Sequence, residues 1–422
     1  MPQAEQVKLI AVLIVGVLIG AALGYFLAPK PATVEEKPPE AVSKIPKKIK
    51  IGLLLDLSGP LATTGKRMEW AMQMAKEDID AYLKSIGVDA EVEFLIEDTT
   101  INPEVALKKL QSLAAQGVKF VIGPMASSEV LSCKSFADSN KILIVSPSST
   151  FPGLAVADDM VFRFVPTDIF QGKALARIII DAGYKNLGII YRKDAWGEGL
   201  MDAVKSNYEA LGGNIASLVP YDPDAKDLSS EIRKLSDELK GLSDAAVLLI
   251  SFETDGVMAM RAASEDPVLS KLEWFGTDGT AYMLTISEQA GDFAVKVGGF
   301  KSTIFAPTES SKFLEFKQEF NSRFGDNPDT YTCNSYDAAW VIVLSIIQVG
   351  EYDAEKVAKV FASVANNYFG VSGWTVLDEN GDRVGGDYEI AAIKSVNGKF
   401  EWVRVGVYSL SSDTVQWLEG KK

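Results

Sequence analysis

The sequence of 422 residues contains no histidine. Histidine is the commonest general base, belongs to the Ser-His-Asp and Cys-His catalytic sets, and is a usual zinc ligand. Those catalytic classes and the usual zinc sites are therefore excluded. The sequence also lacks a G-x-S-x-G motif and an evident Ser-Lys pair, so a serine hydrolase is the weakest functional class considered. We expect neither a metal nor a cofactor.

Cysteine and basic residues are scarce as well. Cys133 and Cys333 are the only two cysteines and are too far apart for a CxxC metal or redox motif. They form one disulfide if the protein is exported, or else remain two buried thiols. The net charge of −15 argues against a nucleic-acid partner, because phosphate binding needs a clustered basic surface.

One long hydrophobic run lies near the N-terminus. Residues 9–27 carry no charge, and this run is long enough to span a bilayer as a helix. A cleaved secretory signal is the alternative. We favour an uncleaved anchor within residues 1–28, followed by a Pro-, Glu- and Lys-rich tether at 29–47. No cysteine follows the run, so a lipoprotein anchor is excluded.

From residue 48 onward, short apolar runs alternate with amphipathic segments. Strands at 49–57 and 92–96 are each followed by a helical pattern, and the same rhythm restarts after Pro166. Strict alternation of this kind predicts parallel sheets with helices on both faces. The restart indicates a second α/β lobe. Towards the C-terminus, Asn380-Gly381 and Asn397-Gly398 are typical of turns in antiparallel hairpins.

Small hydroxyl residues follow two of the predicted buried strands. One run ends before Ser127 and Ser128, and another ends in Ser146-Pro-Ser-Ser-Thr150. Ligands of open parallel sheets bind beyond the carboxyl ends of the strands, so these hydroxyls predict a wall of a small-molecule site. The two serines also stand at the expected start of a helix, where N–H groups attract a carboxylate. The simpler interpretation is that they only cap this helix.

Two further residues occupy similar positions and have two interpretations each. Asp278 follows a predicted strand and either makes an Asp-Gly turn or pairs with an ammonium group. Trp196 stands at a strand–helix junction and belongs either to the core or to the wall of a ligand pocket. Their shared position at strand carboxyl ends favours a binding site.

Several of these motifs, taken in order, resemble the type I periplasmic binding proteins. Within that group the chain is similar to the branched-chain amino-acid (Leu/Ile/Val) binding proteins of ABC transporters, over roughly residues 48–408. The motifs that carry the resemblance are Ile51-Gly-Leu-Leu-Leu-Asp-Leu-Ser-Gly-Pro60 with Gly65, the turn from Gly123-Pro124 to Ser128, Ser146 to Thr150, Phe162-Arg163, Trp196-Gly-Glu-Gly199 and Asn334-Ser-Tyr-Asp-Ala338.

The resemblance implies an α/β fold of two Rossmann-like lobes joined by three crossovers. The first lobe would comprise residues 48–165 plus 304–372, and the second would comprise 166–303 plus 373–422. The ligand would lie between the lobes, which would close over it by a hinge motion. This family binds solutes and carries out no bond chemistry, so the protein is not expected to be an enzyme.

The resemblance also implies roles for individual residues. Ser127 would bind the carboxylate of the ligand, while the backbone of Ser148 together with Thr150 would hold its carboxylate and ammonium groups. Asp278 would pair with the ammonium, and Trp196 would close over the ligand from the second lobe. Two more positions complete the expected site, Thr64 and Phe252, with Glu253 as the alternative to Phe252.

We therefore expect a solute receptor anchored in the cell membrane by one N-terminal span, with its body outside the cytoplasm. Its ligand would be an amino acid, branched-chain or otherwise apolar, and its partner an ABC transporter permease. Two alternatives stay open from the sequence. The protein could be a sensing ectodomain for a membrane partner, or it could bind an amide, urea or an aromatic acid.

Overall fold

The structure of this protein is a computed structural model that describes residues 44–418. The expected anchor at residues 1–28, and most of the expected tether at 29–47, lie outside the described residues. Among residues 44–418, no helix combines the length and the hydrophobicity that a membrane span requires.

The first sheet contains five parallel strands in the order β2-β1-β3-β4-β5. These strands are β1 (Lys48–Leu55), β2 (Glu91–Asp98), β3 (Phe120–Ile122), β4 (Leu143–Ser146) and β5 (Val161–Arg163). The helices between them are α2 (Ala62–Ser85), α3 (Pro103–Ala115) and α4 (Ser127–Asn140). Every residue of β3 and β4 is buried, which explains why these strands are runs of apolar residues without alternation.

The second sheet contains eight strands in the order β15-β14-β13-β10-β9-β8-β6-β7. Its parallel part is formed by β6 (Asn186–Arg192), β7 (Asn214–Tyr221), β8 (Ala245–Ile250), β9 (Glu273–Gly276) and β10 (Lys301–Phe305). The antiparallel strands β13 (Tyr388–Val396), β14 (Lys399–Ser409) and β15 (Thr414–Trp417) extend it beyond β10. Its helices are α5 (Asp168–Asp181), α6 (Ala195–Ala210), α7 (Ser229–Leu239), α8 (Glu253–Ser264) and α9 (Leu284–Lys296).

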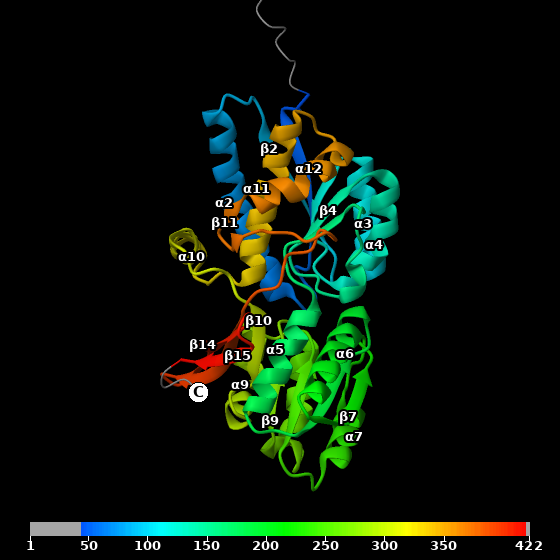
Figure 1. Cartoon of the computed structure of the whole chain (residues 1–422), viewed down its shortest axis with the longest axis vertical. Coiled ribbons are helices and arrows are strands. Elements are labelled where there is room, and N and C mark those ends of the chain that lie inside the picture. The colour runs from blue at the N-terminus through cyan, green and yellow to red at the C-terminus, as the bar shows by residue number, and fades with distance from the viewer. Residues whose placement is uncertain (1–43, 419–422) are drawn as a thin grey trace, which may run out of the picture. The chain divides into compact units, whose positions relative to one another are not determined.

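The chain passes between the two sheets three times. It leaves the first sheet after β5, returns after β10, and enters the second sheet again at β13. The returning segment forms α10 (Ser311–Phe324), α11 (Thr330–Val349) and α12 (Ala354–Asn366), then a short ribbon of β11 (Phe369–Gly370) and β12 (Gly373–Trp374). Helix α11 packs on α2 and β3, and α12 contacts β4, so these late helices lie beside the blue and cyan elements of Figure 1. We call the first sheet with α2–α4 and α10–α12 the first lobe, and the second sheet with α5–α9 the second lobe. The prediction of two α/β lobes is confirmed.

The two predicted turns have different surroundings. Asn397 and Gly398, with φ angles of 52° and 79°, connect β13 to β14 as a two-residue hairpin turn, as predicted. Asn380-Gly381 makes a turn closed by a hydrogen bond from the Gly381 N–H to the Asp378 carbonyl, 3.1 Å long. The segments on either side of this second turn pair antiparallel through a bridge between Leu377 and Arg383, so the prediction of an antiparallel hairpin turn is confirmed, although the pairing is limited to this bridge.

The two cysteines are free thiols. Cys133 lies in α4 and Cys333 in α11, and both are buried. The alternative of one disulfide is therefore wrong. Burial raises the pKa of the Cys133 thiol to about 12, so this side chain remains protonated and unreactive.

A buried ion pair connects the first sheet to the segment that enters the second sheet. Arg163, on β5, binds Asp382 with two parallel hydrogen bonds of 2.5 Å each, and its third nitrogen donates to the carbonyls of Ser149 and Phe151. The side chains of Arg163 and Asp382 are at most 2% exposed. Arg163 thus fixes the loop after β4 and the third connection between the lobes.

Asp382→Ala leaves the Arg163 charge buried without its partner, so we expect the free energy of unfolding to fall by about 3–5 kcal/mol. Urea titration measures this change. The control is Glu77→Ala, which removes an exposed partner of Arg323 and should cost at most about 1 kcal/mol. Equal effects of the two substitutions would contradict the structural role of the buried pair.

Glu129, on α4, is a fully buried carboxylate. Its Oε2 accepts a hydrogen bond of 3.1 Å from the Ala126 N–H, which caps the helix, while its Oε1 has no hydrogen-bond donor among residues 44–418. Burial raises the pKa of Glu129 from 4.5 to about 7, against the opposing effect of the hydrogen bond from Ala126. The folded protein therefore holds this proton more tightly than the unfolded chain does.

This difference predicts how stability changes with pH. Between the unfolded pKa of 4.5 and the folded pKa of about 7, the unfolded chain loses the Glu129 proton first. The free energy of unfolding should therefore fall by about 3 kcal/mol across this window as pH rises. Denaturant titrations at both ends of the window should show that Glu129→Gln lacks this decrease. A decrease of the same size in the variant would exclude Glu129 as its source.

Candidate functional site

Both parallel sheets have the strand order second, first, third, fourth, fifth. The order reverses between β1 and β3 in the first sheet and between β6 and β8 in the second. Such a reversal leaves a crevice beyond the carboxyl ends of the two strands, because the helices that follow them lie on opposite faces of the sheet. Four of the expected site residues follow these four strands: Thr64, Ser127, Trp196 and Phe252. The other three follow neighbouring strands, Ser148 and Thr150 after β4 and Asp278 after β9.

A small cavity lies between the two lobes at these crevices. Its volume is about 20 Å³, enough for about one water molecule. Six of the seven predicted site residues line it: Thr64, Ser127, Ser148, Trp196, Phe252 and Asp278. The lining also includes Leu61, Met125, Ala126, Gly279, Met283 and Tyr331, which the sequence analysis did not identify.

The first lobe contributes the N-terminus of α4 and two serines. Ala126 is the N-cap residue and Ser127 the first residue of the helix, so the interpretation of Ser127 as the cap is wrong. The Ser127 hydroxyl accepts hydrogen bonds from the Ser149 hydroxyl (3.0 Å) and the Phe151 N–H (3.2 Å). Its own hydrogen is thus free to be donated into the cavity. The Ser148 hydroxyl donates to the Met125 carbonyl at 2.9 Å.

The second lobe contributes an aromatic wall. The rings of Trp196 and Phe252 are stacked, with centroids 4.7 Å apart and planes at 18°. The guanidinium of Arg192 lies 4.1 Å from the centre of the Phe252 ring and forms ion pairs of 2.9 Å with Asp194 and Asp255. These contacts hold the rings of Trp196 and Phe252 and the guanidinium of Arg192 against one another.

Asp278 is the acidic group of the cavity. Its Oδ2 accepts a hydrogen bond of 2.5 Å from the hydroxyl of Tyr331, on α11 of the first lobe. Its Oδ1 is buried and meets no hydrogen-bond donor within the described part of the chain. Burial raises the pKa of Asp278, and the hydrogen bond from Tyr331 opposes this shift. The unpaired oxygen is therefore a strong acceptor for a positively charged donor.

A second carboxylate, Asp168, lies near Asp278 but does not line the cavity. It is fully buried at the start of α5, and burial together with the neighbouring Asp278 charge raises its pKa well above the ordinary value. Thr150 donates its hydroxyl hydrogen to Asp168 Oδ2 at 2.9 Å. Thr150 is thus the one predicted site residue that the structure places outside the lining. Sequence reasoning missed Asp168 because nothing along the chain shows that an aspartate at a helix start is buried.

Direct contacts hold the two lobes together beside the cavity. Glu253, the alternative to Phe252, donates its N–H to the Pro60 carbonyl at 3.1 Å. Its carboxylate accepts hydrogen bonds of 2.8 Å from the Thr63 hydroxyl and from the Thr285 N–H. Phe252 therefore faces the cavity while Glu253 bridges the lobes, which makes this arrangement a closed one.

Known proteins resemble this chain over most of its length. Residues 67–395 match a family described as the receptor family ligand binding region. An uncharacterized protein of Methanocaldococcus jannaschii is 38% identical over 388 residues, which cover 87% of this chain and 91% of that protein. The leucine-, isoleucine-, valine-, threonine- and alanine-binding protein of Pseudomonas aeruginosa is 26% identical, over 81% of this chain and 89% of the relative.

A solved structure shows the same fold. The leucine-binding protein LivK from Thermotoga maritima superposes with a TM-score of 0.71 at 22% sequence identity, and the match covers 84% of this chain and 97% of that one.

Proposed function

Because this chain belongs to the type I periplasmic binding proteins, in the branched-chain amino-acid family, we propose that it captures an apolar α-amino acid between its lobes. The observation that carries the proposal is the polarity of the cavity. Hydrogen-bond donors from a helix N-terminus lie on one side of the cavity, and an unpaired carboxylate oxygen lies on the other. Apolar side chains lie between them. This arrangement is complementary to a zwitterion.

The carboxylate of the amino acid would bind at the start of α4. The first N–H groups of a helix have no partner within the helix, and the helix dipole favours a negative charge there. The free hydrogen of the Ser127 hydroxyl adds a donor. Ser148 would contribute through its backbone, since its hydroxyl is already bonded to Met125.

The ammonium group would bind Asp278. Oδ1 of this residue is buried without a donor, and a charged N–H donor is the most favourable partner for it. Asp168 lies behind Asp278 and adds a second negative charge. We assign Thr150 to the positioning of Asp168 instead of direct ligand contact.

The side chain of the ligand would meet apolar groups. Leu61, Met125 and Met283 line the cavity together with the stacked rings of Trp196 and Phe252. Thr64 is the exception, but its hydroxyl is directed to Asp329 at 3.2 Å. This lining favours a branched-chain or another apolar amino acid over a polar one. An aromatic acid, an amide or urea would lack the ammonium group that Asp278 requires.

Capture would proceed by closure of the lobes. A cavity of about 20 Å³ is too small for an amino acid. The ligand would therefore enter a more open arrangement of the lobes and would be enclosed when they close. Ligand contacts from both lobes favour the closed form. The protein would then deliver the amino acid to an ABC transporter permease. Residues 9–27 would anchor it in the membrane, with the body outside the cytoplasm and no bond chemistry taking place.

Isothermal titration of the purified protein with the common α-amino acids tests the proposal, with urea, acetamide and benzoate as controls. We expect heat from apolar amino acids only. Asp278→Asn should weaken binding by at least about 30-fold, because the ammonium loses its charged partner. Asp292→Asn, an exposed change of the same kind on α9, should leave affinity unchanged. Binding of benzoate alone, or unchanged affinity in Asp278→Asn, would remove Asp278 from the proposed role.

Binding should also release protons. The raised pKa values of Asp168 and Asp278 mean that the pair holds a proton more readily before binding, and an ammonium group lowers both values. Affinity should therefore increase as pH rises through the raised pKa values and become constant above them. The measurement is the dependence of the binding enthalpy on the ionisation enthalpy of the buffer. An enthalpy that is the same in all buffers from about pH 5 to about pH 8 would contradict this coupling.

A further inference from the structure

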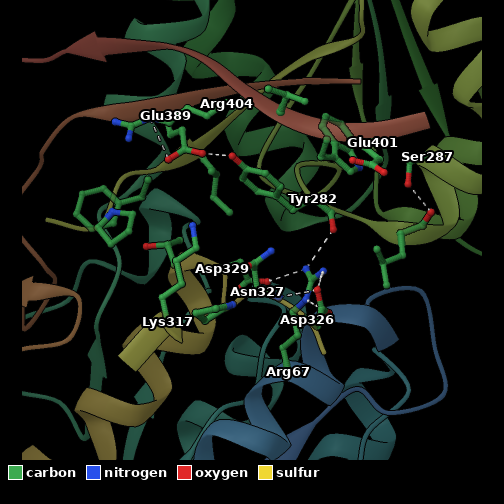
Figure 2. A pocket seen from close by; sticks show the side chains of 18 of the residues that line it. Arg67, Tyr282, Ser287, Lys317, Asp326, Asn327, Asp329, Glu389, Glu401 and Arg404 are labelled. Carbon is green, nitrogen blue, oxygen red and sulfur yellow. Dashed lines mark hydrogen bonds and ion pairs between the residues drawn. The ribbon is translucent and has the colours of Figure 1, made fainter. Parts of the chain in front are cut away.

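A second and much larger cavity lies between the lobes. Its volume is about 840 Å³, within the range of sites that bind small organic molecules. The first lobe contributes Arg67 and residues 326–330, and the second lobe contributes Tyr282 and parts of β13 and β14. Figure 2 shows Arg67, Asp326 and Asp329 on one side of this space and Glu389, Glu401 and Arg404 on the other. We call it the outer cavity.

The outer cavity shares a wall with the amino-acid cavity. Tyr282 lines the outer cavity while its neighbour Met283 lines the amino-acid cavity, and Thr330 and Tyr331 are divided in the same way. Hydrogen bonds hold this wall together, including one of 3.1 Å from Arg67 to the Tyr282 carbonyl. A molecule in the outer cavity would therefore contact the back of the wall that encloses the amino acid.

Each lobe places one arginine between two carboxylates at the outer cavity. Arg67 pairs with Asp326 at 2.7 Å and with Asp329 at 3.5 Å. Arg404 pairs with Glu309 and, at 3.4 Å, with Glu389. One negative charge on each side is thus left unneutralised.

The remaining charges do not cancel this excess. Lys317 and Lys399 are balanced by Glu288 and Glu401, so the complete lining has six acidic and four basic side chains. The excess is two negative charges, which favours a cationic occupant.

The chemistry of the lining indicates an organic cation and not a metal ion. No group of three or more metal-ligating side chains occurs within residues 44–418. Aromatic and aliphatic side chains form much of the surface, among them Phe305, Phe313, Tyr282 and Trp402. Aromatic faces attract ammonium groups, and they also bury apolar carbon.

Three polar groups in the outer cavity have unused hydrogen-bonding capacity, and one of them is a donor, the buried Arg404 Nε, which has only its 3.4 Å ion pair with Glu389. The Thr330 side chain is 2% exposed, and its hydroxyl has no partner in the described region. Glu389 accepts a hydrogen bond from the Tyr282 hydroxyl on Oε1, whereas Oε2 has only the 3.4 Å ion pair with Arg404. Thr330 and Glu389 can accept a hydrogen bond from an ammonium ion.

From these observations we propose that the outer cavity binds an organic ammonium ion with an apolar body, such as an alkyl or aryl amine. Such a ligand contacts both lobes and therefore favours their closed arrangement. If the proposed amino-acid function holds, the two ligands strengthen each other's binding, because coupling between sites is reciprocal.

The test uses 2-phenylethylammonium and butane-1,4-diammonium chlorides, titrated calorimetrically into the full chain in detergent micelles without an amino acid. Because these probes could also bind Asp278, each titration is repeated with Asp278→Asn. Binding that persists in this variant is independent of Asp278 and supports the outer cavity as the site. Binding lost in this variant, or no heat from either probe at millimolar concentration, overturns the proposal. This outcome does not depend on whether the protein binds amino acids.

Two variants of opposite sign then test the charge of the ligand. Glu389→Gln removes a negative charge and should weaken probe binding by about tenfold, whereas Lys317→Met removes a competing positive charge and should strengthen it. In Figure 2 the Lys317 side chain points from α10 into the cavity. Glu209→Gln, an exposed change on α6, is the matched control and should have no effect. A reversed pair of effects, or none, overturns the proposal.

The coupling is tested by titrating leucine with and without a saturating probe. Tighter leucine binding in the presence of the probe supports the coupling, and equal affinity overturns it.

Discussion

A parallel sheet whose strands follow the order second, first, third must leave a crevice where that order reverses, because successive helices there cover opposite faces. Both sheets of this protein have this order, and the two crevices face each other across the small cavity. The residues at these points follow β1, β3, β6 and β8. Thr64, Ser127, Trp196 and Phe252 therefore meet although almost 190 positions separate the first from the last. The site depends on this repeated strand order more than on any single side chain.

The two sides of the small cavity differ in their electrostatic character. One side has the N–H groups of α4, and the other has Asp278 with Asp168 behind it. Burying two neighbouring carboxylates is unfavourable for folding, and both pKa values are raised in consequence. A positively charged ligand relieves this repulsion. The protein thus retains an unfavourable arrangement that an ammonium group would make favourable.

The contacts between the lobes have different characters. Arg163 and Asp382 form a buried, doubly hydrogen-bonded pair at a connection that both open and closed arrangements would keep. By contrast, Glu253 reaches Thr63 and Pro60 of the first lobe through two single hydrogen bonds beside the cavity. Contacts of the second kind are weak enough to break and re-form. The wall between the two cavities also contains single hydrogen bonds between the lobes, from Arg67 to the Tyr282 carbonyl and from Tyr331 to Asp278.

The sequence by itself determined the α/β class, the presence of two lobes and six of the residues that line the small cavity. Buried parallel strands are continuous apolar runs, and their carboxyl ends mark where ligands bind, so Ser127, Ser148 and Asp278 were identifiable from local pattern and family resemblance. Only the tertiary structure decided what lies behind these residues. Segments that are distant in sequence bring Asp168 next to Asp278 and Thr150 next to Asp168. Such segments also form the hydrogen bond from Tyr331 and the outer cavity. Burial and pairing of this kind depend on packing in three dimensions, which no local periodicity records.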